Sequence, residues 1–93
     1  MSIQSFKSKD TETLYQSGKS RAFGNITNVV FRKLDMLNAA AALKDLRSPP
    51  GNHLEALSGN RAGQHSVRVN DKWRVCFTWT PAGPEDVEIV DYH

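Results

Sequence analysis

The sequence predicts an α+β fold in which two helices pack on one face of a small, largely antiparallel, twisted sheet. The first half of the chain carries apolar residues at helical spacing, whereas the second half carries them at alternating positions. Short turns rich in Gly, Pro, Asn and Asp separate the alternating segments, as is typical of antiparallel neighbours. The predicted element order is β-α-α-β-β-β, and residues 1–93 are expected to form a single domain.

Each element of the first half has a local signal. Residues 2–6, SIQSF, hold two apolar anchors and are expected to form a short first strand. Asp10 is the expected N-cap of a short helix that ends at Gly18, and Asn25 is the expected cap of a second helix. The second helix has a single apolar stripe with steps of three or four residues: Ile26, Val30, Leu34, Leu37 and Ala41.

The second half of the chain changes to a period of two, which is typical of strands. A further short strand is possible at HLEAL, before three alternating segments: QHSVRVN, WRVCFTW and VEIVDY. The side chains expected to face the helices are Val67, Val69, Val75, Phe77, Trp79, Val87 and Ile89. The residues of opposite parity are expected on an uncovered face: Ser66, Arg68, Asn70, Arg74, Cys76, Thr78, Glu88, Val90 and Tyr92.

The charge is unevenly distributed along the chain, although the formal net charge is only +2. Residues 47–79 contain five Lys or Arg and two acidic residues, whereas residues 80–93 contain four acidic residues and no Lys or Arg. A basic centre beside an acidic end suits a surface that binds a polyanion, with acid–base groups at its rim. A mixed, solvated surface is equally compatible with this distribution.

Several classes of protein do not fit the sequence. No apolar run approaches the roughly 20 residues that a membrane span needs, and the N-terminus lacks the apolar core of a signal peptide. A cytoplasmic location without membrane association is therefore expected. The single Cys76 has no disulfide partner and no metal-ligand spacing around it, so it is interpreted as a reduced packing residue. Neither a metal nor another cofactor is expected.

Residues 46–79 and the terminal VEIVDYH resemble the HigB-type toxins, the plasmid-maintenance killer branch of the RelE superfamily. The most specific parts are the hairpin GNRAGQHSVRVNDKWRVCF and the final Asp-Tyr-His. The resemblance implies a RelE-like fold and the toxin of a type II toxin–antitoxin system. It further implies a metal-independent, ribosome-dependent endoribonuclease that cuts mRNA by 2′-hydroxyl attack, leaves a 2′,3′-cyclic phosphate and inhibits translation. The implied partners are the ribosome, mRNA and a HigA-type helix-turn-helix antitoxin.

The resemblance carries the family's catalytic positions onto Arg74, Asp91, Tyr92 and His93. Arginine can donate two parallel hydrogen bonds to a phosphate. An imidazole titrates near neutral pH, and a terminal carboxylate on His93 is expected to favour its protonated form, which suits a general acid. Tyr92 can bind the phosphate or stack on a base, and Asp91 is interpreted as an orienter of the terminal segment or of His93.

The general base stays open between two residues. Relatives place a histidine and a lysine in the short strand and turn where this chain has Glu55 and Ser58, and His53 lies two positions before Glu55. Glu55 is the aligned residue, but His53 is expected on the same strand face and could also reach the site. Three other basic residues are interpreted as contacts to RNA and the ribosome: Arg61, Arg68 and Lys72.

Two other functions remain compatible with the sequence. One is a non-enzymatic growth inhibitor, like the ParE-type members of the superfamily that inhibit DNA gyrase by binding. The other is a degenerate family member that only binds its antitoxin and regulates an operon. The Asp-Tyr-His set and Arg74 favour the ribonuclease, because a protein that acts by binding alone needs no acid–base groups.

Overall fold

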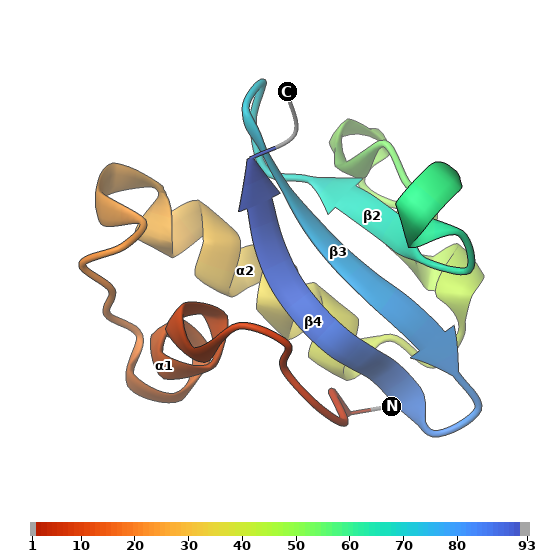
Figure 1. Cartoon of the computed structure of the whole chain (residues 1–93), viewed down its shortest axis with the longest axis horizontal. Helices are drawn as coiled ribbons and strands as arrows, with labels where there is room; N and C mark the ends of the chain where they lie inside the picture. The colour runs from red at the N-terminus through yellow and green to blue at the C-terminus, as the bar shows by residue number, and fades with distance from the viewer. Residues whose placement is uncertain (1, 92–93) are drawn as a thin grey trace.

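Two α-helices pack against a four-stranded antiparallel sheet in the computed structural model, which describes residues 2–91 (Figure 1). The strands lie in the order β1-β2-β3-β4, and each pairs with the next in the chain. The helices and strands are α1 (Lys9–Ser17), α2 (Thr27–Ala39), β1 (Glu55–Ala56), β2 (His65–Arg68), β3 (Trp73–Thr80) and β4 (Gly83–Asp91). Short 3-10 turns connect them: η1 (Gly24–Ile26), η2 (Leu43–Arg47), η3 (Pro50–Asn52) and η4 (Gly59–Arg61). The predicted α+β class is confirmed, and the possible strand at HLEAL is β1.

The expected first strand is reduced to a single parallel bridge between Phe6 and Val87. Around this bridge the Lys7 backbone N–H donates to the Val87 carbonyl at 3.0 Å, and the Val87 N–H donates to Ser5 at 3.1 Å. The Gln4 N–H also donates to the carbonyl of Pro84, at 2.7 Å. The N-terminal segment therefore covers the outer edge of β4, which would otherwise offer unpaired backbone groups.

The expected helix caps are wrong, while one expected helix end is confirmed. Helix α1 is capped by Ser8, whose Oγ accepts from the Thr11 N–H, so Asp10 lies inside the first turn. Gly18 ends this helix in the left-handed conformation, as predicted. Asn25 does not cap the second helix either, because the turn η1 carries the chain into α2 without a side-chain cap.

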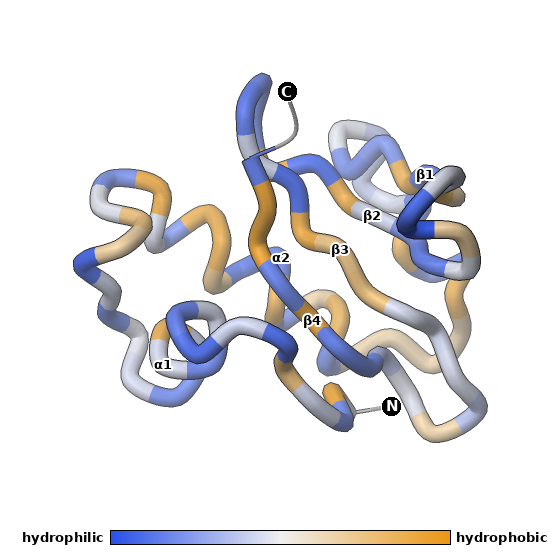
Figure 2. Tube along the Cα trace, in the orientation of Figure 1, coloured by the Kyte–Doolittle hydropathy of each residue, from blue (hydrophilic) through white to orange (hydrophobic). Residues whose placement is uncertain are grey.

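The core lies between the helices and one face of the sheet. Figure 2 shows hydrophobic residues along α2 and the central strands. The cluster includes Leu14 of α1 and the predicted α2 stripe residues Val30, Leu34 and Leu37. From the sheet it takes five of the predicted core residues: Val67, Val75, Phe77, Val87 and Ile89. Val69 and Trp79 are only partly buried at its margin, and Ala41 lies beyond the end of α2 and is exposed. No helix within residues 2–91 is long and apolar enough to cross a membrane.

Asn52 holds the segment that leads into β1. Its side chain is fully buried, and its Nδ2 donates to the carbonyls of Leu46 at 3.1 Å and Ser48 at 3.3 Å. The ammonium of Lys33 on α2 donates to its Oδ1. Because these bonds satisfy buried polar groups on η2, η3 and α2 together, the approach to β1 is fixed against the helical layer.

Candidate active site on the second face of the sheet

Two rows of side chains cross the face of the sheet that points away from the core. The strand registers align the first row as Glu55, Ser66, Cys76 and Glu88. The second row is Arg68, Arg74 and Val90. Because alternate residues of a strand point to opposite faces, these side chains share the face opposite Val67, Val75 and Ile89. For the residues of these two rows, the predicted assignment to faces agrees with this register.

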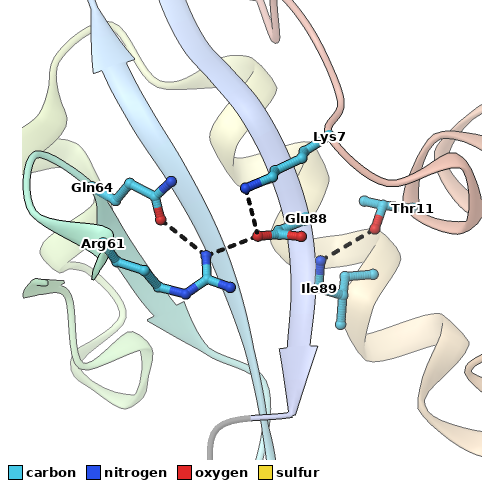
Figure 3. Close-up of polar contacts among 6 residues, drawn as sticks. All are labelled: Lys7, Thr11, Arg61, Gln64, Glu88 and Ile89. Atoms are coloured by element: carbon cyan, nitrogen blue, oxygen red, sulfur yellow. Dashed lines mark hydrogen bonds and ion pairs between the residues drawn. The ribbon is translucent and has the colours of Figure 1, made fainter. Parts of the chain in front are cut away.

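The prediction that this face is uncovered is wrong. Ser66 and Cys76 are fully buried, and only 9% of Arg74 is exposed. One polar side chain, that of Arg61, crosses from η4 to Glu88 on β4 (Figure 3). The candidate site is therefore a packed polar layer with an exposed margin.

Arg74 is held in place by hydrogen bonds to β2 and to the segment before β1. Its Nε donates to Ser66 Oγ at 2.7 Å, and its Nη2 donates to the His53 carbonyl at 2.6 Å. The Ser66 carbonyl lies 3.4 Å from the same Nη2. These bonds fix the orientation of the guanidinium before any ligand binds, as electrostatic stabilisation of a transition state requires.

Glu55 and Arg74 are brought together. Glu55 Oε1 lies 3.9 Å from Arg74 Nη2, and 56% of the Glu55 side chain is exposed. His53 does not share the strand face of Glu55, because β1 begins at Glu55 and His53 adopts a left-handed conformation with φ 43° before it. His53 contributes its backbone carbonyl to Arg74. Of the two candidates for the general base, the geometry supports Glu55.

The three basic residues expected to contact RNA each pair with an acidic residue. Arg61 Nη1 donates to Glu88 Oε1 at 2.8 Å, and Arg68 pairs with Asp71. Lys72 Nζ lies 3.6 Å from Asp91 Oδ2, and 5.3 Å from the centre of the Trp73 ring. Arg68 and Lys72 lie on either side of the turn between β2 and β3, whereas Arg61 extends from η4 to β4.

The terminal residues are only partly described. Asp91 pairs with Trp73, and Val90 before it pairs with Arg74, so the described chain ends one residue beyond the partner of Arg74. Asp91 is exposed and lies on the opposite face from Arg74, as its parity predicted. Tyr92 and His93 lie outside the described residues, and their catalytic roles stay predictions.

Cys76 is a buried free thiol in the centre of the polar face. Burial raises the pKa of the Cys76 thiol, and Glu88 adds to this rise, while Arg61 and Arg74 oppose it. The thiolate is the reactive form, so a raised pKa leaves little of it near neutral pH. Its interpretation as a reduced packing residue fits this environment.

We expect native Cys76 to react with an aromatic disulfide reagent at pH 8 at least about 10²-fold more slowly than in guanidinium chloride, because reaction requires local opening as well as deprotonation. Raising the pH should speed the native reaction as the thiolate forms. The release of the coloured thiol, followed with time, measures both rates. Equal rates in the folded and unfolded protein would contradict the burial of this thiol.

The sequence reasoning missed the part played by Glu88, Ser66 and Gln64, of which Gln64 accepts a hydrogen bond from Arg61 at 3.1 Å. Alternation placed Glu88 and Ser66 on the correct face, but it gave no signal for their bonds to arginines distant in the chain. Together the face offers one fixed guanidinium, an exposed carboxylate beside it and a second arginine bound to Glu88. No three His, Cys, Asp or Glu side chains within residues 2–91 gather in a way that could hold a metal ion. The described groups suit phosphate binding and proton transfer.

Comparison with known proteins places the chain in a family. Residues 4–93 match the family described as the RelE-like toxin of type II toxin–antitoxin system HigB. Toxin HigB-1 of Vibrio cholerae serotype O1 is 46% identical over 76 residues, which cover 80% of each chain. An uncharacterized protein of Haemophilus influenzae is 42% identical over 67 residues, 70% of this chain and 66% of that one. The solved YoeB/ParE toxin from Agrobacterium tumefaciens superposes with a TM-score of 0.57 at 17% identity, over 100% of both chains, which supports the fold.

Proposed function

Since the chain belongs to the HigB-like toxin family of type II toxin–antitoxin systems, we propose that it cleaves mRNA on the ribosome and so inhibits translation. One observation carries this proposal: hydrogen bonds to Ser66 Oγ and the His53 carbonyl fix the buried guanidinium of Arg74, and the Glu55 carboxylate lies beside it. A fixed cation next to an exposed carboxylate is the arrangement that phosphodiester cleavage by a ribose hydroxyl requires.

The proposed chemistry is an in-line attack within the RNA chain. Glu55 takes the proton from a ribose 2′-hydroxyl, and the 2′-oxygen forms a bond to the adjacent phosphorus. Arg74 stabilises the charge on the phosphorane oxygens with paired hydrogen bonds. The bond from phosphorus to the 5′-oxygen breaks, and His93 gives that oxygen a proton. The products are a 2′,3′-cyclic phosphate and a free 5′-hydroxyl.

The remaining proposed roles support this step. Tyr92 binds the phosphate or stacks on a base, and Asp91 orients the terminal segment. Arg68 and Lys72, on either side of the β2–β3 turn, contact RNA phosphates, which adds salt-sensitive affinity without sequence preference. The ribosome aligns the mRNA, since positioning alone can lower a barrier by several kcal/mol. No metal ion takes part in the proposed reaction.

A type II toxin has an antitoxin partner. We propose that this partner is a helix-turn-helix protein of the HigA type, encoded beside the toxin gene. Co-expression of the neighbouring gene should restore growth in cells that are arrested by the toxin. Growth arrest that persists at equal antitoxin expression would contradict this pairing.

The direct test is to map the 5′ ends of a transcript bound to purified ribosomes, with and without the protein. We expect new ends inside the coding sequence, 2′,3′-cyclic phosphates on the upstream fragments and little cleavage of naked RNA. Cleavage should survive removal of other divalent ions once the Mg²⁺ that the ribosome needs is restored. Growth arrest without any transcript cleavage would overturn the ribonuclease and favour a toxin that acts by binding alone.

Glu55→Gln should lower the single-turnover rate of cleavage by about 10²-fold, the low end for loss of a general base, because the amide cannot accept the proton. His53→Asn is the matched control, since asparagine tolerates the left-handed backbone there and keeps the carbonyl that binds Arg74. Quenched time courses on programmed ribosomes give both rates. A large loss for His53→Asn with a parental rate for Glu55→Gln would assign the base to His53.

A further inference from the structure

Glu88 joins three parts of the chain that are distant in sequence (Figure 3). Arg61 Nη1, at the end of η4, donates to Glu88 Oε1 at 2.8 Å and to Gln64 Oε1 at 3.1 Å. Lys7 Nζ of the N-terminal segment lies 3.9 Å from the same Glu88 oxygen. Only 16% of the Glu88 side chain and 30% of the Arg61 side chain are exposed, against 58% for Lys7. The Arg61–Glu88 contact is therefore a partly buried, charge-assisted hydrogen bond, whereas the Lys7 contact is a surface one.

The Arg61–Glu88 pair links β4 to the connection that follows Glu55 in the chain. Strand β1 has only two residues, and a pairing this short cannot fix a side chain by itself. The chain after it, residues 57–64, returns to β2 through η4, where the Leu57 N–H donates to the Gln64 carbonyl at 2.9 Å. Arg61 is the residue of this connection that reaches β4. It thereby attaches the loop behind Glu55 to the opposite end of the row Glu55–Ser66–Cys76–Glu88.

Contact with an RNA phosphate would draw Arg61 away from this position. The guanidinium would have to leave Glu88, and a largely buried carboxylate would then lose its closest cation. Arg68 and Lys72 differ from Arg61, because their acidic partners are more exposed. The exposed fraction is 97% for the Asp71 side chain and 45% for the Asp91 side chain. Water can replace those partners at little cost, so the two residues can exchange them for a phosphate.

We propose that Arg61 and Glu88 are positioning residues, whose ion pair holds the β1–β2 connection across the sheet and thereby keeps the Glu55 carboxylate beside Arg74. This role replaces the RNA contact that the sequence predicted for Arg61. It rests on the proposed function, in which Glu55 is the general base and Arg74 binds the phosphate.

A double-mutant cycle on programmed ribosomes tests the proposal. Arg61→Ala and Glu88→Ala should each lower the single-turnover rate constant at saturating ribosome by about tenfold, and the double variant should lose no more than either one, as expected for residues that act as a unit. Affinity for the ribosome and its dependence on salt should stay parental. Glu88→Gln keeps an oxygen that accepts from Arg61, so its rate should lie between those of Glu88→Ala and the parent.

Lys7→Ala is the matched control. It removes a charge near Glu88 without breaking the Arg61–Glu88 pair, so it should cleave at the parental rate.

Three results would overturn the proposal. If Glu88→Ala strengthens ribosome binding while Arg61→Ala weakens it and lowers the salt slope by about one, Arg61 contacts a phosphate. If the variants lose cleavage amplitude at an unchanged rate constant, the pair supports folding and does not position the base. If the two single losses add up in the double variant, the residues do not act as a pair. A parent protein that cleaves no ribosome-bound transcript would instead overturn the proposed function, and this role with it.

Discussion

Arg74→Ala should lower the single-turnover rate of mRNA cleavage by about 10²–10³-fold, the usual scale for losing one preorganised donor to a developing negative charge. Arg74→Lys should recover little of this loss, because an ammonium cannot donate two parallel hydrogen bonds to a phosphate. An ammonium also cannot reproduce the bonds to Ser66 Oγ and the His53 carbonyl. Both variants should bind the ribosome with nearly parental affinity, since the loss concerns the transition state.

The same substitution should also destabilise the fold. From the sequence alone, Arg74 is predicted on an uncovered face of the sheet. The structure shows it buried, with two short hydrogen bonds that alanine would remove. Leaving such buried acceptors unpaired costs about 1–3 kcal/mol, which thermal unfolding can measure. The control is Arg68→Ala in the same row, which should weaken ribosome binding and leave the rate at saturation unchanged. A folded Arg74→Ala protein that cleaves at the parental rate would remove Arg74 from the active site.

His93→Ala should lower cleavage by about 10²–10⁴-fold, the range for loss of a positioned general acid. The parental rate should fall as the pH rises, because only a protonated imidazole can donate to the leaving oxygen. The variant should lose this fall and show only the titration of the remaining groups. Single-turnover rates across the pH range in which ribosomes stay intact measure the difference.

Growth arrest tests the role of His93 in toxicity independently of the cleavage assay. The parent and His93→Ala should be expressed at equal levels, and Tyr92→Phe serves as a comparison because it keeps the ring and removes only the hydroxyl. We expect arrest by the parent, weaker arrest by Tyr92→Phe and none by His93→Ala. Equal arrest by all three proteins would mean that neither the His93 imidazole nor the Tyr92 hydroxyl is needed for toxicity.

The sequence predicts the features that local backbone geometry determines, such as which residues of a strand share a face. Alternation assigns residues to sheet faces, so Val75 and Phe77 were placed in the core and Arg74 on the other face before any contact was known. The predicted N-cap of α1 was wrong because serine and aspartate are both good N-caps. Local sequence does not choose between the neighbouring candidates Ser8 and Asp10.

The covering of the polar face could not be predicted in the same way. It includes a bond between Arg61 and Glu88, which lie 27 residues apart and whose pairing no periodic pattern records. In the candidate site, too, the sequence suggests a residue but not its distance from its neighbours. The alignment suggested Glu55, but its distance to Arg74 follows from the tertiary path of residues 52–56. The family is confirmed, whereas the catalytic roles of Glu55, Arg74, Asp91, Tyr92 and His93 all stay predictions.

The N-terminal segment along the edge of β4 has a consequence for the synthesis of the protein. Asp86 N–H donates to Ser5 Oγ across 81 positions of sequence, and Ile89 N–H donates to Thr11 Oγ1 across 78. Contacts this distant give the fold a high contact order, and they form only after β4 has been translated. Until then the first residues have no strand to pair with, and the row that contains Glu88 is missing. Under the proposed function, a nascent chain therefore cannot cut the message from which it is being translated before its last strand has left the ribosome.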